Sequence, residues 1–284
     1  MTTNLKLGSY IEIKNIQNTS KVTSHFNQNP LKILLPKTHN KAVHLVTTNY
    51  GGGMVQGDNI QFTINANKDT KALLTSQANA RVYKSEDGRF CKMIQKTNVH
   101  ENAEFYQLND PLVLHSNGKL KQFTEFELGK NSVLFFMDWV QAGRVSTGEV
   151  FQFHHFYSEI NIKKEGKRVV ADKFMISPDT QKCTSPAVFF KHTNFINIFL
   201  VGDEKNEKVQ LMEEKLSTVT HQTVQANITQ EPEVLVSFDR INSEVVLVRL
   251  SSINHDKLYD FIHEFSKIFK NNSLLNFNPY DRKL

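Results

Sequence analysis

Short runs of strand-forming residues recur along this chain at intervals of about ten residues as far as Leu200. Most runs alternate apolar and polar residues, and Gly, Pro, Asn or Asp separate them. In Asn59–Asn65, for example, alternation puts Ile60, Phe62 and Ile64 on one face of a strand. This spacing predicts a mainly β fold in which layers of strands stack on one another.

Helical periodicity appears only late in the sequence. Residues Glu204–Leu216 carry apolar side chains at spacings of three and four. Residues Asn254–Phe269 place an apolar stripe on one face, and Asn254 is a candidate N-cap. Between them, Glu233–Phe238 and Val245–Leu250 have the composition of strands. We therefore expect two α-helices in the C-terminal third of the chain.

The overall composition indicates a soluble, cytoplasmic protein. Of the 284 residues, 39% are hydrophobic, and the mean hydropathy is −0.41. No apolar run approaches the ~20 residues that cross a membrane, and no signal segment opens the sequence. No linker, repeat or low-complexity segment interrupts the chain, so we expect a single domain over residues 1–284.

The net charge of +5 comes from basic and acidic residues that are mostly interspersed. No basic stripe with interleaved aromatic residues is present, which argues against nucleic-acid binding. The densest basic cluster, Lys163–Arg168, surrounds Gly166 and predicts a hairpin tip. Such a cluster is usually a solvated turn, and the alternative is a patch for phosphate or for an acidic partner.

Two cysteines, Cys91 and Cys183, belong to no CxxC pair, so we expect two free and mostly buried thiols. Lys92 next to Cys91 offers the alternative of a reactive thiol with a lowered pKa, although a thiol on a strand without a companion His is usually inert.

A glycine-rich loop stands out at Asn49–Asp58, which holds Gly51, Gly52, Gly53 and Gly57. Strand-forming residues lie on both sides, so a bent or closely approached backbone between two strands is predicted. A phosphate-binding loop requires Lys-Ser/Thr and then a helix, whereas here Asp58 and a strand follow. A structural turn is therefore the default interpretation.

Three further segments invite interpretation. Ser76–Ala80 is small and polar, as at a place where another backbone comes close. In Gly143–Glu149, two glycines, Gly143 and Gly148, bracket a turn whose Arg144 could pair with Glu149 or with Asp58. His154 and His155 are weak metal-ligand candidates, because adjacent strand residues point to opposite faces.

Taken in order, several motifs resemble those of the urease accessory protein family UreD, also called UreH. The matching stretches are Gly51–Asp58, Leu74–Lys84, Asp110–Pro111, Gly143–Glu149 and Tyr280–Leu284. The resemblance implies strands coiled into stacked, β-helix-like layers with two helices. It also implies a non-enzymatic scaffold or chaperone that joins urease apoprotein to the accessory proteins UreF and UreG, with a possible homodimer in that complex.

The resemblance further implies that nickel crosses a water-filled passage inside the protein on its way to the urease active site. Weak, exchangeable oxygen or imidazole ligands suit such a passage, because a tight site would trap the ion. We hypothesise carboxylates near the passage, with polar residues that position them and glycines that shape the loops. The carboxylates are Asp58, Glu149 and Asp110, the positioning residues are Gln77, Tyr83 and Arg144, and the glycines are Gly51, Gly52, Gly53, Gly57, Gly143 and Gly148.

No permanently bound cofactor is expected, only transient nickel. Two other classes compete with the scaffold. A small-molecule or metal-dependent enzyme would place its site at the glycine-rich loop and would need a nucleophile and a base within reach. A β-rich adhesion module would need a secretion signal.

Overall fold

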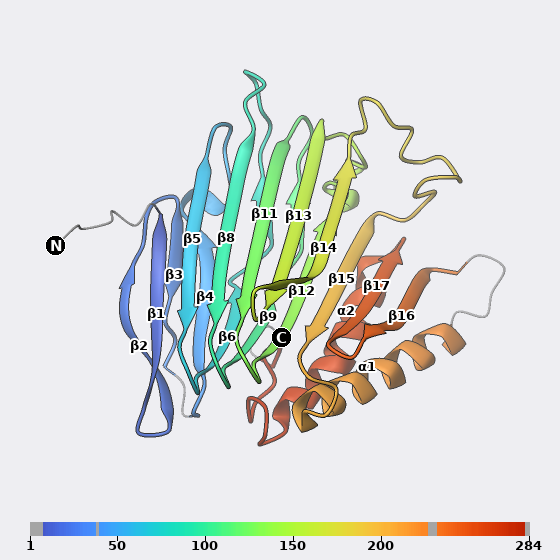
Figure 1. The fold of residues 1–284 in the computed structure, drawn as a ribbon. Coiled ribbons are helices and arrows are strands. Elements are labelled where there is room, and N and C mark those ends of the chain that lie inside the picture. The colour runs from blue at the N-terminus through green and yellow to red at the C-terminus, as the bar shows by residue number, and fades with distance from the viewer. Residues whose placement is uncertain (1–7, 38–39, 227–231, 282–284) are drawn as a thin grey trace.

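The computed structural model describes residues 8–37, 40–226 and 232–281. In this part of the chain, two β-sheets lie face to face, and two helices cover the outer face of the larger sheet (Figure 1). The smaller sheet has, in spatial order, β14 (Lys167–Ile176), β13 (His155–Lys164), β11 (Lys119–Leu128), β8 (Cys91–Val99), β5 (Asn59–Ala66), β1 (Ser9–Ile16) and β2 (Thr19–Phe26).

The larger sheet follows the same direction across the molecule. Its main path is β16 (Val234–Asn242), β17 (Val245–Ser252), β15 (Asn194–Val201), β12 (Val133–Gln141), β9 (Glu104–Leu108), β6 (Lys71–Ser76), β4 (Val43–Asn49) and β3 (Leu31–Leu34). Two short strands, β7 (Ala80–Val82) and β10 (Leu112–Leu114), pair with each other, and β10 also pairs with β12.

The chain between β4 and β13 coils like a β-helix. Successive long strands alternate between the sheets, from β4 to β5, β6, β8, β9, β11, β12 and β13. Along each sheet these strands pair in parallel, as β8 does with β11 and β9 does with β12. The prediction of a mainly β fold built from stacked, coiled layers is confirmed.

Strand burial follows from position in the two layers. In β11 every second residue is buried, because one face of the smaller sheet meets solvent. β15 is buried along its whole length, since the larger sheet lies between the smaller sheet and the helices. Phe126 and Phe136, for example, meet in the core between the sheets with ring centroids 4.9 Å apart.

The two helices, α1 (Glu207–Ala226) and α2 (His255–Ser266), confirm the expected pair. Asn254 caps α2 as predicted, and its side chain accepts a hydrogen bond from Asp256 N at 3.0 Å. The predicted end of the first helix at Leu216 is wrong. The helix continues because Val219, one turn beyond, is also buried against the larger sheet.

β6 and β7 are separated within the small polar run Ser76–Ala80, and residues 77–79 between them are exposed. This interruption borders the cavity described below. The hairpin tip at Gly166 is confirmed, because β13 and β14 pair as an antiparallel hairpin around it. Cys91 and Cys183 are free and buried, as expected.

Candidate functional site

The glycine-rich loop is sharply bent, as its sequence predicts. Residues 50–52 form a short 3-10 turn, in which Gly51 and Gly52 have φ values of +77° and +75°. Gly53 is crowded, because a Cβ there would lie 2.9 Å from the carbonyl oxygen of Arg81. Met54 N donates to that same carbonyl at 2.7 Å. The loop is therefore fastened to β7, which follows the small polar run.

Asp58 and Tyr83 stabilise this loop. The Asp58 carboxylate accepts a hydrogen bond from Val55 N at 2.8 Å, which closes a tight turn within the loop. Tyr83 donates its hydroxyl to the carbonyl oxygen of Gly51 at 3.3 Å. Gln77 donates its backbone N–H to Thr47 O at 2.9 Å, and its side chain is exposed.

The second glycine-bracketed turn contains the predicted ion pair. Arg144 Nε donates to Glu149 Oε2 at 2.9 Å, and Arg144 Nη2 contacts the other carboxylate oxygen. The hydrogen bonds from Arg144 lower the pKa of Glu149. Gly143 is required there, because its φ is +118° and a Cβ would lie 2.3 Å from Glu149 O. Of the two predicted partners of Arg144, the structure selects Glu149.

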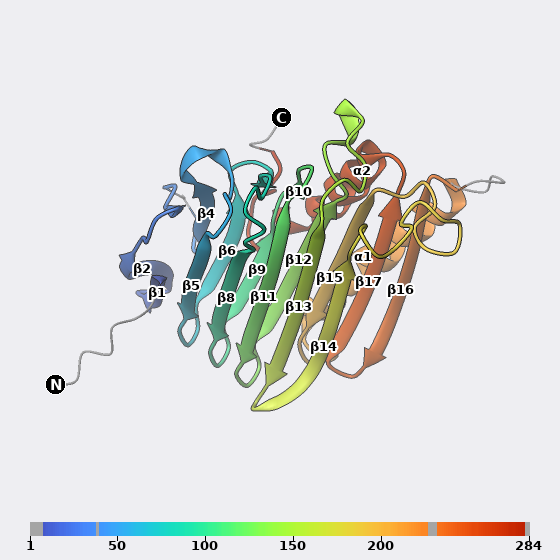
Figure 2. The same cartoon turned by 90° about the horizontal axis from the view of Figure 1, so that it is seen from above.

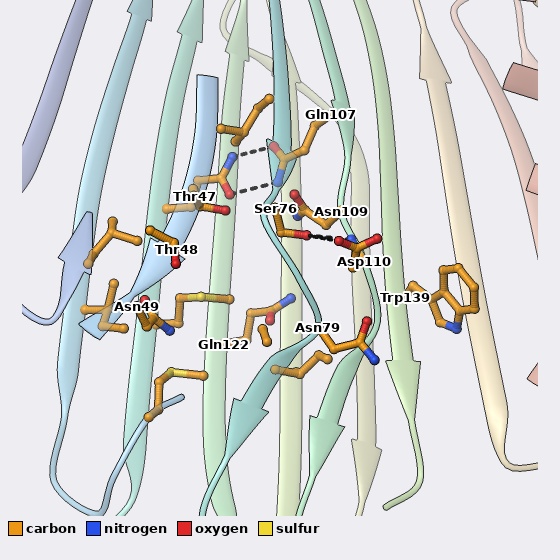
Figure 3. A pocket seen from close by; sticks show the side chains of 18 of the residues that line it. Thr47, Thr48, Asn49, Ser76, Asn79, Gln107, Asn109, Asp110, Gln122 and Trp139 are labelled. Carbon is orange, nitrogen blue, oxygen red and sulfur yellow. Dashed lines mark hydrogen bonds between the residues drawn. The ribbon is translucent and has the colours of Figure 1, made fainter. Parts of the chain in front are cut away.

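A cavity lined by both apolar and polar residues lies between the two sheets, beside the glycine-rich loop (Figure 3). Its volume is about 140 Å³, room for on the order of ten water molecules. Gly52, Met54 and Asn79 are among its lining residues, and Gly52 and Asn79 are exposed. Among the six predicted passage residues, Asp110 lines the cavity. The other five, Asp58, Glu149, Gln77, Tyr83 and Arg144, are outside its lining within the described part of the chain.

Asp110 is held by a serine of the neighbouring strand. Ser76 Oγ donates to Asp110 Oδ2 at 3.1 Å and accepts from Asp110 N at 2.7 Å, as Figure 3 shows. Deeper in the cavity, Gln95 of β8 and Gln107 of β9 exchange two hydrogen bonds across the sheets, at 2.7 and 3.1 Å. Both glutamines are buried, so their amides need such partners, and Gln95 Nε2 also donates to Thr97 Oγ1 at 3.1 Å.

Asp138 is a carboxylate of the cavity that the sequence analysis missed. Its carboxylate accepts a hydrogen bond from Gln122 Nε2 at 3.1 Å and another from Ser158 Oγ at 3.5 Å. Burial raises its pKa to about 6, and the nearby negative charge of Asp172 adds to this effect. The available signal was a single carboxylate inside the most apolar run of the chain, Val133–Val140.

A polar row leads away from Asp138 along the sheets. Asn197 is its register partner on β15, and Arg249 is the register partner of Asn197 on β17. Arg249 forms an ion pair with Asp172 of the opposite sheet. The second carboxylate oxygen of Asp172 is buried and has no hydrogen-bond partner within the described residues. Polar side chains from both sheets thus lead from Asp138 to Arg249, which is 45% exposed.

The two adjacent histidines have separate partners. His154 Nδ1 lies 2.8 Å from a carboxylate oxygen of Asp179, and His155 Nδ1 lies 2.7 Å from Ser177 Oγ. In the described ranges, no group of three or more His, Cys, Asp or Glu side chains is arranged to hold a metal ion.

The thiol of Cys91 is not activated by Lys92. Cys91 Sγ lies 3.0 Å from Val55 O, and burial together with the charge of Asp58 raises its pKa to about 11. The alternative of a reactive thiolate is wrong, because desolvation outweighs any attraction to Lys92.

Comparisons with known proteins identify the family. The protein-family model described as UreD urease accessory protein matches residues 8–282. The chain belongs to the UreD family. A protein named urease accessory protein UreD from Cytophaga hutchinsonii is 38% identical over 276 residues, which are 96% of each chain. A protein of the same name from Staphylococcus aureus strain JH9 is 27% identical over 188 residues, 65% of this chain and 66% of its own.

The UreD resemblance noted in the sequence is thus confirmed over nearly the whole chain. These relatives are named as accessory proteins rather than as enzymes. Within the described residues, the helices are too short or too polar to cross a membrane.

Proposed function

We propose that the protein is a non-catalytic scaffold that binds urease apoprotein together with UreF and UreG, and that nickel reaches the urease active site through its inter-sheet cavity. Family membership supports the role in urease maturation. Partner binding and nickel transfer follow from the family resemblance and from the chemistry of the cavity.

The observation that carries the nickel route is Asp138 in a cavity whose polar groups are oxygen-rich. Gln122, Thr124 and Asp110 add amide, hydroxyl and carboxylate oxygens to its lining. Such ligands bind a divalent ion weakly, whereas a Cys or His cage would hold nickel. The ion would cross as a hydrated cation that exchanges water for one or two protein oxygens at a time.

The charge of Asp138 suits a passage rather than a binding site. With a pKa of about 6, the carboxylate is mostly ionised at neutral pH, so it attracts a cation. A negative charge on the path lowers the cost of moving a divalent ion out of water. Asp58 and Glu149 then have a structural role. Asp58 accepts a hydrogen bond from Val55 N in the glycine-rich loop, and Glu149 accepts one from Ser116 N.

The glycine-rich loop offers no support for the competing enzyme hypothesis. The backbone of the loop packs against Arg81 and Tyr83. The neighbouring Cys91 thiol has a raised pKa, which makes it a poor nucleophile. We therefore propose no catalytic residue.

The test is urease activation by an Asp138→Asn variant, which keeps the shape of the side chain and removes its charge. The variant is co-produced with urease apoprotein, UreF and UreG at limiting nickel. We expect the complex to form normally, and urease activity to fall about tenfold or more, as when a residue that supports a metal is lost. Excess nickel should restore part of the activity.

Asp260→Asn is the matched control, because Asp260 is exposed on α2, on the far side of the larger sheet. Normal activation by Asp138→Asn at limiting nickel would contradict the nickel route. Failure of the unaltered chain to bind any urease-maturation partner would contradict the scaffold role.

A further inference from the structure

The two sheets are stacked strand over strand, and side-chain contacts fix which strand faces which. Gln95 of β8 meets Gln107 of β9, and Gln122 of β11 meets Asp138 of β12. At the far end, Asp172 of β14 pairs with Arg249 of β17. β14 is the last strand of the smaller sheet, but the larger sheet continues with β16. Within the described residues, the smaller sheet is therefore one strand short at this end.

The face of β16 that lacks a cover is partly apolar. Ser237 is the register partner of Arg249, whose side chain points towards the smaller sheet, so alternate residues of β16 share that face. Leu235 is on this face and is 52% exposed, and Ile241, at the register shift between Arg240 and Asn242, is 53% exposed. Figures 1 and 2 show β16 at the edge of the molecule, beyond β14. The opposite face of β16 packs towards α1 through residues such as Phe238.

The free edge of β14 borders this uncovered face. In the described part of the chain, β14 pairs with β13 alone, so the backbone groups of its other edge have no strand partner. Phe174, Phe189 and Leu235 line a groove between β14 and the larger sheet. Neighbouring strands in a sheet lie about 4.8 Å apart, so one added strand beside β14 would lie over β16.

Basic residues at one end of β14 indicate what kind of segment would bind beside this strand. Lys167 and Arg168 lie at the hairpin end of β14 and are exposed. Among the described residues, neither has a carboxylate within ion-pair distance. They belong to the basic cluster that the sequence analysis left open between a solvated turn and a patch for an acidic partner. A strand with carboxylates at this end would pair with them as well as with the backbone of β14.

We propose that the open end of the sandwich binds an extended segment of a partner protein, which pairs with the edge of β14 and covers β16. The segment carries apolar side chains over Leu235 and Ile241 and carboxylates near Lys167 and Arg168. This inference rests on the proposed function, because the partner is a protein of the urease-maturation complex.

A second copy of this chain is a poor occupant. β14 lies over β17, so a second copy that paired its own β14 antiparallel to this edge would bring its β17 into the place of β16. A different chain with a single extended strand fits without this conflict.

The experiment measures backbone hydrogen exchange in β14, first in the isolated chain and then in its complex with urease apoprotein, UreF and UreG. We expect the exposed-edge amides of β14 to exchange at least about tenfold more slowly in the complex. A double variant, Leu235→Asp with Ile241→Asp, should lose this protection and weaken the complex. Both side chains are more than half exposed, so the fold should tolerate the change.

Val224→Asp is the matched control, because Val224 is 50% exposed on α1, on the opposite side of the larger sheet. Protection of β14 that survives in the control and is lost in the double variant supports the inference. A complex that forms and activates urease without protecting β14 overturns the inference and leaves the proposed function intact.

Two other outcomes would also contradict the inference that a partner segment pairs with β14. Protection of β14 that grows with the concentration of the isolated chain, together with a dimer mass in light scattering, would assign the edge to a second copy. No complex between the unaltered chain and these partners would contradict the proposed function and this inference with it.

Discussion

Asp138 shows how one side chain acquires a role from its surroundings. Its neighbours in sequence are apolar, and its neighbours in space are Gln122, Ser158 and Asp172. β11, β13 and β14 of the opposite sheet supply these groups. A carboxylate that lines a small cavity inside a β core costs folding free energy, and the nickel route that we propose gives its charge a function.

The raised pKa of Asp138 predicts a pH-dependent stability. The ordinary carboxyl pKa is 3.8, and the folded protein holds the proton up to a pH of about 6. Between these values the folded state binds more protons than the unfolded state, so the stability contributed by this group falls as the pH rises. Relative to the parent, Asp138→Asn should gain about 2 kcal/mol in free energy of unfolding between about pH 4 and pH 7.

Urea unfolding of both proteins across this pH range checks the prediction, with Asp260→Asn as the exposed control. A stability difference between Asp138→Asn and the parent that stays constant with pH would contradict it.

Single-residue predictions from the sequence succeeded where partners are close along the chain. Arg144 and Glu149 are five residues apart on one turn, so their pairing follows from local geometry. The Gln95–Gln107 pair and the contacts of Asp138 join different sheets. No local pattern encodes how two sheets are placed over each other, so sequence analysis missed these residues.

At the scale of the element, hydrophobic periodicity and caps were sufficient to predict that a segment is a helix, but not where the helix ends. α2 begins after Asn254, as its cap and apolar stripe predict. α1 continues past Leu216 through Ser217–Thr220, which include weak helix formers, because Val219 and Leu216 bury their side chains on the larger sheet. Tertiary packing there outweighs local propensity, and a single sequence does not show it.

α2 fastens the outer layer to the larger sheet through aromatic side chains. Phe265 is fully buried, and its ring stacks on Phe135 of β12 with centroids 5.0 Å apart. Phe265→Ala should lower the free energy of unfolding by about 3–5 kcal/mol, because it removes a large side chain from a packed core. Asn254→Ala, which removes the helix cap, should lower the free energy of unfolding by only about 1 kcal/mol.

Equilibrium unfolding by urea measures both changes on the element. If Phe265→Ala and Asn254→Ala lowered the free energy of unfolding equally, this would contradict the view that packing, rather than capping, holds α2 on the sheet.

At the scale of the whole molecule, coiling the chain between two sheets produces an interior that side chains from both layers line. The sequence predicted the stacked layers and the two helices, since strand spacing and helical periodicity are local signals. The cavity depends on which polar residues meet across the sheets, such as Ser76 and Asp110 or Gln122 and Asp138. Of the predicted passage residues, the structure brings Asp110 to that cavity.

The central claim is that nickel passes through this cavity, and a blocking substitution tests it most directly. Thr124 is buried on β11 and lines the cavity. Thr124→Phe fills part of the space without changing charge, whereas Thr124→Val keeps the size of the side chain and is the matched control. Each variant is co-produced with urease apoprotein, UreF and UreG at limiting nickel, and pull-down verifies that the complex forms.

The decisive measurement is the nickel content of the purified urease. The cavity route predicts that Thr124→Val loads urease as the parent chain does and that Thr124→Phe loads about tenfold less or lower, with the complex intact. Full nickel loading by Thr124→Phe in an intact complex would show that the ion takes another path.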